Sequence, residues 1–162
     1  MNHDDVIAVL NKPLSLELMN SDVHARIAYN GSDGFPRVIP VAYVWNGQEI
    51  VFCSPPNATK VRSLQKDPKV AITIDTDDFP PKLLLIRGTA AIEIVDGIPD
   101  EFIEGARRQV PAEGFAEWEA GSRALYDQMA RIAITPYWVR YYEFGAGRMP
   151  RFLQELAERN RS

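Results

Sequence analysis

The chain has 162 residues, of which 46% are hydrophobic and 25% are charged, a composition typical of an ordinary globular protein. Its 22 acidic and 18 basic side chains give a formal net charge of −4, which argues against non-specific binding to nucleic acid or to a membrane surface. The single cysteine, Cys53, excludes an internal disulfide and a cysteine cluster, and with two histidines no metal site is predicted. The sequence shows no cationic leader and no apolar run of about 18 residues, so we expect a cytoplasmic protein that does not cross a membrane.

The first third of the sequence predicts two short helices followed by a β-hairpin. Residues 4–10 and 14–19 have the apolar spacing of helices, and Pro13 separates them. Strands are expected over three segments that follow, residues 23–28, 38–45 and 49–53. Asn46–Gly47 joins the last two strands, and this dipeptide is typical of a two-residue type I′ turn.

The rest of the chain predicts three more strands and three helices. Asn57 is expected to cap a helix over residues 57–65, which ends before Pro68 because the residue before proline disfavours helical geometry. Strands are expected over residues 69–75, 83–95 and 132–144. Gly88 predicts a bend or bulge in the longest of them. Residues 99–108 and 115–130 are expected to be helical, and residues 152–156 give the last segment a small apolar face.

These elements define the expected fold class. Six strands follow one another through mostly hairpin-type connections, and alternating strand–helix–strand units are missing, so a parallel doubly wound sheet is not predicted. The pattern favours a mainly β protein, a small antiparallel barrel with peripheral helices. Since no repeat, low-complexity tract or long linker divides the chain, residues 1–162 are expected to form a single domain with a helical insert around 99–130.

The sequence has few residues in patterns typical of catalysis. It contains no glycine-rich phosphate loop, no nucleophile elbow and no zinc-binding helix motif. Cys53 is interpreted as a half-buried strand residue and His24 as a packed or surface imidazole. The three aspartates between residues 75 and 78 are interpreted as a solvated loop.

One segment is unusual in its charge. Residues 57–66 contain Lys60, Arg62 and Lys66 but no carboxylate, although the protein is acidic. A lysine in the first turn of a helix is disfavoured by the helix dipole. An anion bound at the helix start by free N–H groups, the Thr59 hydroxyl and the Lys60 ammonium would account for it. The alternative is a solvated cationic helix face.

Three segments carry a family resemblance: residues 36–45 (PRVIPVAYVW), 50–54 (IVFCS) and 59–70 (TKVRSLQKDPKV). The most specific piece is the run Lys-x-Arg-x-Leu-x-x-Asp-Pro in the third segment. In this order they resemble the pyridoxamine 5′-phosphate oxidase-like family of FMN-binding split barrels. The resemblance extends over roughly residues 23–95 and, more loosely, 132–144, whereas residues 99–130 match no family motif.

The resemblance implies a six-stranded antiparallel split barrel of Greek-key topology. It also implies a homodimer with an FMN in each of two sites at the subunit interface. By position, the implied cofactor-binding residues are Ile39, Pro40, Val41, Ala42, Cys53, Ser54, Thr59 and Lys60. The first four would run beside the isoalloxazine ring, Cys53 and Ser54 would flank the ribityl chain, and Thr59 and Lys60 would hold the phosphate.

The sequence departs from the vitamin-processing oxidases of the family in two places. Ile39 and Val44 are apolar where those enzymes carry cations, and Leu83 and Leu84 stand where they place a glutamine against the flavin. Oxidation of pyridoxamine phosphate is therefore not predicted.

Three functions follow as hypotheses. The first is an FMN-dependent oxidoreductase acting on an unidentified small molecule, in which the cofactor supplies the chemistry. The second is a reductase using the deazaflavin coenzyme, whose more anionic tail could be met by Arg37, Arg62 and Arg148. The third is a non-enzymatic flavin-binding or flavin-sensing protein.

A homodimer is also favoured by the number of large aromatic residues on the predicted strands. They exceed what one small barrel can bury, and an interface of roughly 2,000 Å² would cover them. These residues are Tyr43, Trp45, Trp138, Tyr141 and Tyr142.

Overall fold

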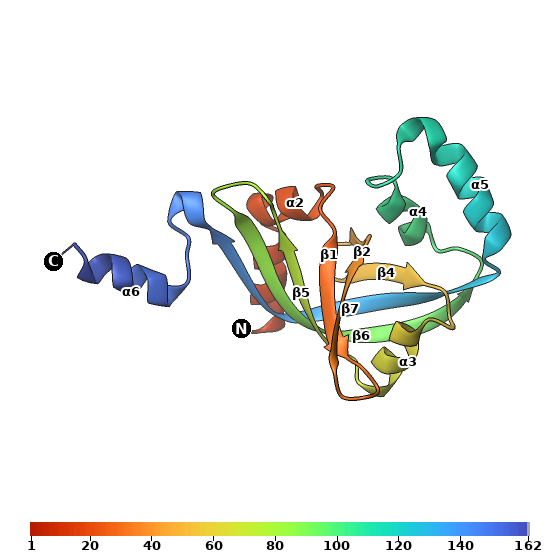
Figure 1. Ribbon diagram of the computed structural model, residues 1–162, viewed down its shortest axis with the longest axis horizontal. Helices are drawn as coiled ribbons and strands as arrows, with labels where there is room; N and C mark the ends of the chain where they lie inside the picture. Colours follow the sequence, from red (N-terminus) through yellow and green to blue (C-terminus); the bar gives the residue numbers. More distant parts are fainter. Residues whose placement is uncertain (162) are drawn as a thin grey trace.

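The structure, a computed structural model, describes residues 1–161. Within them, seven antiparallel strands form one curled sheet in the order β2-β1-β5-β6-β7-β4-β3 (Figure 1). The strands are β1 (Ala25–Asn30), β2 (Pro36–Val41), β3 (Val44–Trp45), β4 (Ile50–Ser54), β5 (Lys69–Asp75), β6 (Lys82–Asp96) and β7 (Gln128–Glu143). This confirms the mainly β, antiparallel split barrel with peripheral helices, with seven strands in place of the six expected.

The additional strand arises because the predicted strand over residues 38–45 is broken at Ala42 and Tyr43. β2 ends on one edge of the sheet, and the chain continues as β3 on the opposite edge. Because three residue steps span at most about 11 Å, the two edges approach each other here. Tyr43 is 1% exposed, and its hydroxyl donates a hydrogen bond to the Met19 carbonyl at 3.0 Å. A buried aromatic ring therefore occupies the point where the barrel is split.

The Asn46–Gly47 hairpin is present, but its turn is not the two-residue type I′ turn expected. Residues 46–49 connect β3 to β4. The Asn46 side-chain carbonyl accepts the N–H groups of Gln48 and Glu49 at 3.0 and 2.7 Å. Among the described residues only glycines have positive φ, including Gly47 at 95°, whereas a type I′ turn needs positive φ at both central residues. The Asn46 side chain thus builds a longer turn.

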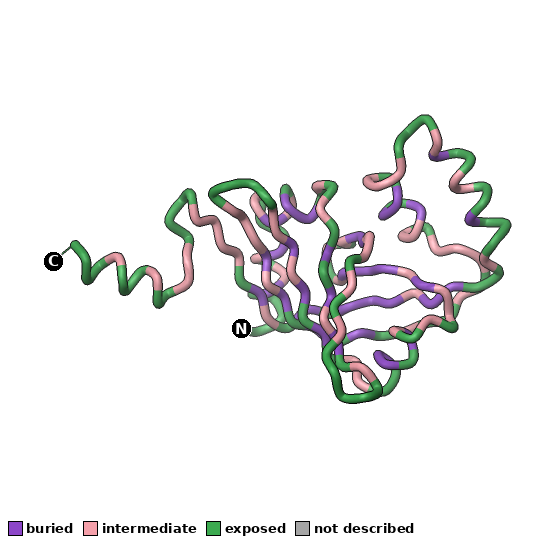
Figure 2. Tube along the Cα trace, viewed as in Figure 1, coloured by how far each residue is buried: buried purple, intermediate pink, exposed green. Residues whose placement is uncertain are grey.

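Six α-helices accompany the barrel in the described residues. They are α1 (His3–Leu10), α2 (Pro13–Met19), α3 (Thr59–Lys66), α4 (Asp100–Ala106), α5 (Phe115–Leu125) and α6 (Arg151–Arg159). α1 and α2 bury apolar side chains in the barrel core, among them Leu10 and Met19. Figure 2 shows the resulting pattern, in which buried positions follow the strands and these two helices.

Two helix boundaries differ from those expected. The helix predicted over 115–130 ends at Leu125, because Met129 and Ala130 already pair with β6 at the start of β7. The predicted cap, Asn57, lies outside α3, whose N-cap is Ala58 and has no side-chain capping hydrogen bond. At both boundaries the local residue pattern fits a helix as well as the conformation that the structure shows, so the pattern alone does not fix where the helix ends or begins.

Gly88 lies at the predicted irregularity in the longest strand pair. The register between β6 and β7 shifts between Arg87 and Gly88, and Gly88 pairs with Pro136. A Cβ on Gly88 would lie 2.5 Å from the Ile134 side chain and 2.8 Å from the Thr135 carbonyl oxygen. Glycine is therefore required here by a close approach of backbone and side chain, and the bulge also accommodates the proline.

We expect Gly88→Ala to lower the free energy of unfolding by roughly 1–3 kcal/mol, because the added methyl overpacks a rigid strand pair. Gly114→Ala is the matched control, since a Cβ there meets nothing within 4 Å. Urea unfolding of both variants and the parent measures the difference. Equal midpoints for the two variants would contradict the close packing at Gly88.

The helix α6 stands apart from the barrel at the end of the chain (Figure 1). None of its residues is buried, and Phe152 and Leu156 are 62% and 49% exposed. None of the helices formed by residues 1–161 has the length and apolar character needed to cross a membrane.

Candidate functional site

A pocket of about 350 Å³ lies beside the split in the barrel, between the end of β2, the end of β4 and the helical insert. It is lined by His24, Pro40, Val41, Ala42, Cys53, Ser54, Pro55, Lys60, Phe102, Ala106, Gln109, Val110 and Trp118. The lining contains no carboxylate. Its volume falls at the lower end of the range for small-molecule sites.

The pocket brings together six of the eight residues expected to bind a cofactor: Pro40, Val41, Ala42, Cys53, Ser54 and Lys60. Ile39 is absent from the lining because it packs partly against the barrel core. Thr59 is exposed at the first residue of α3 and does not line the pocket. The role of all eight residues as cofactor ligands remains a prediction.

Lys60 is the one cation of the pocket lining. Its ammonium group donates a hydrogen bond to the Ser54 hydroxyl at 3.2 Å, and within residues 1–161 it forms no ion pair. It belongs to the first turn of α3, where backbone N–H groups lack helical acceptors and no side chain caps them. The cation and the helix start together favour an anion at this end of the pocket.

The opposite wall comes from the helical insert, which the sequence did not connect to the site. Phe102 on α4 and Trp118 on α5 stack at 5.6 Å between ring centroids with an interplanar angle of 19°. Phe115 packs beside Trp118, with ring centroids 5.5 Å apart. The only signal in the sequence was the gathering of aromatic residues between 102 and 118. The pocket thus has an apolar, aromatic wall facing the strand ends.

Arg108 fastens this wall to the barrel. Its guanidinium donates hydrogen bonds to the backbone carbonyls of Met19, Ser21 and Tyr43, and it lies 4.9 Å from the centroid of the Tyr43 ring. The insert packs against residues 42–43, which separate β2 from β3, since a Cβ on Gly105 would lie in van der Waals contact with the Tyr43 nitrogen at 3.4 Å. The insert is therefore attached at the point where the barrel splits.

Cys53 lies in a pocket environment that keeps its thiol protonated. Burial, and to a smaller extent the charge of Glu101, raises the pKa of this thiol to about 12, while Arg131 acts in the opposite direction. Arg131 pairs with Cys53 across the β4–β7 ladder and holds Glu101 at 2.7 Å. Because the thiolate is the nucleophile, Cys53 serves as an apolar wall residue at neutral pH.

This gives a pH-dependent prediction for iodoacetamide alkylation of Cys53. At pH 9 a thiol with a pKa of about 12 is only about one part in a thousand thiolate, whereas the unfolded thiol is about half ionised. Alkylation of the native protein should therefore be far slower than alkylation in urea. The rate for the native protein should begin to rise only at a higher pH than the rate for the unfolded protein. Mass spectrometry of timed samples measures both rates. Similar rates in the two states would show that the thiol is not protected.

The three arginines considered for a longer anionic tail are not gathered at the pocket. Arg37 pairs with Asp33 at 2.7 Å in the hairpin between β1 and β2, and Arg148 pairs with Glu143 at 3.4 Å after β7. Arg62 is exposed on α3. None of them lines the pocket.

Several solved structures share this fold at low sequence identity. An F420 reductase has a TM-score of 0.60 with 22% identity over 77% of this chain and 94% of that one. A conserved hypothetical protein from Mycobacterium tuberculosis has a TM-score of 0.62 with 18% identity, covering 93% and 89%. HutZ, the heme storage protein from Vibrio cholerae, has a TM-score of 0.55 with 19% identity, covering 86% and 94%. No curated protein matches the sequence.

At the level of families the match is extensive. The profile described as pyridoxamine 5′-phosphate oxidase matches residues 16–142, which include every strand of the barrel up to Tyr142 and all the residues that line the pocket. The chain therefore belongs to the pyridoxamine 5′-phosphate oxidase family.

Proposed function

We propose that the protein binds FMN in the pocket beside the barrel split and acts as a flavin-dependent oxidoreductase on a small molecule. The observation that carries this proposal is the ammonium of Lys60, which lies at the start of α3, is hydrogen-bonded to Ser54 and has no carboxylate partner in the described residues. Such a donor set suits a phosphate monoester, because free N–H groups and an ammonium meet its charged oxygens.

The remaining lining residues fit the rest of such a cofactor. Strand-end residues 40–42 offer backbone groups to the polar edge of a planar ring, and the Phe102–Trp118 pair offers it an apolar wall. Ser54 contributes a hydroxyl, while Cys53 contributes a neutral thiol. When bound, the flavin supplies hydride or electron transfer, and the chain binds, orients and shields it from water.

The deazaflavin coenzyme is the second candidate, favoured by the shared fold of the F420 reductase. The separation of Arg37, Arg62 and Arg148 places no cluster of cations at the pocket for its longer anionic tail, so we place FMN first. The third candidate function is that of a flavin-binding protein that catalyses no reaction.

Mass analysis of the ligand released from purified protein tests these candidates, together with titration of FMN and of the deazaflavin coenzyme. FMN is expected to bind more tightly. Tighter binding of the deazaflavin would reverse our order, and binding of neither would overturn the proposal. Oxidation of NAD(P)H by the loaded protein separates an enzyme from a binding protein.

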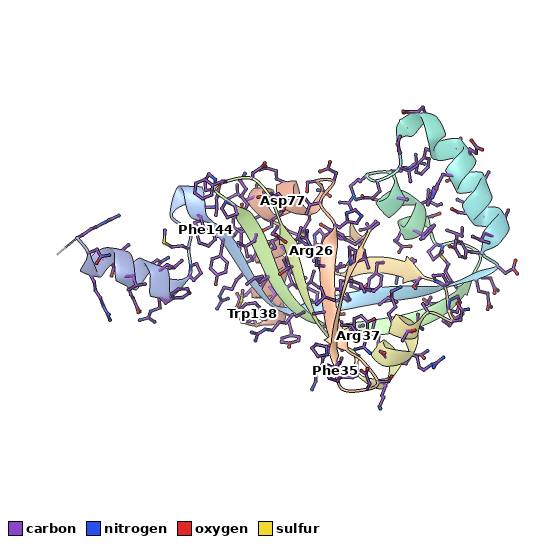
Figure 3. All side chains as sticks on the ribbon, viewed as in Figure 1. Arg26, Phe35, Arg37, Asp77, Trp138 and Phe144 are labelled. Atoms are coloured by element: carbon purple, nitrogen blue, oxygen red, sulfur yellow. The ribbon has the colours of Figure 1, made fainter. Side chains whose placement is uncertain are left out.

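We also propose a homodimer. Tyr43 no longer argues for it, because one chain buries that ring completely. The outer face of the sheet argues for it instead, since a groove of about 380 Å³ runs over β1, β5, β6 and β7 with Val38 and Trp138 among its lining residues. Figure 3 marks Trp138 on β7 and Phe35 at the hairpin tip, and Phe35 and Val38 are 71% and 64% exposed.

Val38→Asp is expected to produce monomers, because a carboxylate in the lining of this groove would have to be desolvated in the interface. Light scattering at micromolar concentration should give twice 18.2 kDa for the parent and 18.2 kDa for the variant. Phe79→Asp, at an exposed loop position away from the groove, is the control. A parent protein that is monomeric would contradict the proposed homodimer.

A further inference from the structure

His24 is the one titratable side chain of the cofactor pocket to which the proposed function gives no role. It lines the pocket and is exposed to solvent. Its imidazole takes part in none of the ion pairs formed within residues 1–161. Imidazole is the side chain that ordinarily changes its charge between pH 5 and 8, which suits it to proton transfer.

Strand pairing fixes where His24 stands in the pocket. The residue directly precedes Ala25, which pairs with Val41 at the end of β2. His24 therefore lies beside residues 40–42, whose backbone groups face the planar ring in the proposed cofactor complex. Lys60 and Ser54, which would face the phosphate, are bonded to each other on α3 and at the end of β4. By this arrangement the imidazole belongs to the ring end of the proposed site.

The helical insert holds the segment before His24 from the other side. The Gln109 side-chain amide donates a hydrogen bond to the Asp22 carbonyl at 3.1 Å, and the Arg108 guanidinium donates one to the Ser21 carbonyl at 3.2 Å. The backbone at His24 is thus placed by a strand pair and by the insert together. A group that is already in place for reaction loses less entropy when the reaction occurs.

The other side chains of the lining do not compete for this role. Burial keeps the Cys53 thiol protonated, with a pKa of about 12. The Lys60 ammonium is bonded to Ser54 and is assigned to the phosphate. Among the described residues, the lining contains no carboxylate. The imidazole is therefore the group of the pocket that can both give and take a proton near neutral pH.

We propose that His24 is the general acid of this pocket and supplies the proton that accompanies hydride transfer. The inference rests on the proposed function. The hydride carries two electrons from the reduced flavin to one atom of an unsaturated substrate. An N–H bond of the His24 imidazolium breaks as its proton passes to a second atom of that substrate, which is thereby reduced. The neutral imidazole regains a proton from water, to which it is exposed.

NMR titration of the full chain with FMN tests the position of the imidazole. The sequence has two histidines, and the other, His3, is exposed on α1 and does not line the pocket. FMN should shift the imidazole Hε1 resonance of His24 and leave that of His3 unchanged, and the spectrum of His24→Gln assigns the two signals. An unmoved His24 resonance in protein that has bound FMN would overturn this inference alone. Absence of FMN binding in the same titration would overturn the proposed function with it.

Single-turnover oxidation of the loaded protein tests the proton transfer. The flavin is reduced with light and EDTA, and the protein is then mixed with menadione, which takes up a hydride and a proton, or with ferricyanide, which takes up electrons alone. His24→Gln should slow oxidation by menadione by at least about a hundredfold, as expected for a lost general acid. Its rate with ferricyanide should stay within about twofold of the parent, which also shows that the variant is folded and loaded. His3→Gln should match the parent with both oxidants.

The pH profile of the parent gives a second measure of the same step. The rate with menadione should fall as the pH rises through the pKa that NMR measures for His24, because the charged imidazole is the donor. The charged side chains on the segments around it are Asp22, Lys60 and Arg108. Carboxylate, ammonium and guanidinium groups ordinarily titrate outside the neutral range, so a profile centred there reports the imidazole. Equal rates of His24→Gln and the parent with menadione would overturn the inference and leave FMN binding untouched.

Discussion

Replacing Lys60 with alanine is expected to weaken FMN binding by about ten- to a hundredfold, the value of one charge-assisted hydrogen bond to a phosphate. The residue is in the first turn of α3, lines the pocket and forms no ion pair in residues 1–161. Its charge is locally unfavourable against the helix dipole, so its loss should change apoprotein stability by less than about 1 kcal/mol. Fluorescence titration with FMN and urea unfolding of the apoprotein measure the two effects.

Three variants separate the possible roles of Lys60. Lys66→Ala removes an exposed cation at the other end of the same helix and should bind FMN like the parent. Thr59→Ala removes a neutral donor and should have a smaller effect of the same sign. Ser54→Ala removes the hydroxyl that now accepts from Lys60 at 3.2 Å. If Lys60→Ala binds FMN normally, the anion lies elsewhere; if it unfolds early without cofactor, Lys60 is a structural residue.

The strands and their irregularities could be predicted because their signals are local. The β5 strand has the bounds expected from its alternating residues, and Gly88 lies at the bulge it predicted. The local sequence also predicted that Lys60 lies in the first turn of a helix, and it does. These features depend on periodicity, glycine geometry and helix boundaries, all of which act within a few residues.

The break at Ala42–Tyr43 could not be predicted in the same way. The run from Val38 to Trp45 is apolar and aromatic, and apart from Pro40, two residues before the break, it carries no turn signal, so the sequence favours one continuous strand. What divides it is tertiary: the chain leaves one edge of the sheet and joins the other, and Tyr43 is held by the Met19 carbonyl from a distant helix. Closure of a barrel is a global constraint that a local pattern does not record.

The insert was missed for a related reason. Its elements were expected as helices, but their role depends on where residues 99–125 fold back over the barrel. Phe102 and Trp118 line the pocket on an insert that Arg108 joins to the barrel through three carbonyls on two separate segments, at Met19 and Ser21 and at Tyr43. An arginine with carbonyl partners 65 to 89 residues away has no sequence signature.

Arg108→Met is expected to lower the free energy of unfolding by about 2–4 kcal/mol and to loosen the pocket wall. The substitution keeps an apolar stem but removes charge-assisted hydrogen bonds to Met19, Ser21 and Tyr43, leaving part-buried carbonyls without their donor. The insert should then open independently of the barrel, because local stability follows local contacts. Hydrogen exchange of residues 99–125 should rise more than exchange of β5 and β6.

Arg107→Met is the matched control on the same helix end, since this exposed side chain has only a ring contact with Phe115 at 4.4 Å to the centroid. Its loss should cost about 0.5–1 kcal/mol and leave exchange in the insert near that of the parent. Arg108 does not line the pocket, but FMN affinity should fall for Arg108→Met because the neighbouring Gln109 and Val110 lose their placement in the lining. Unchanged FMN affinity with faster exchange would mean that the insert shields the pocket without shaping it. Equal exchange in both variants would show that Arg108 does not hold the insert on the barrel.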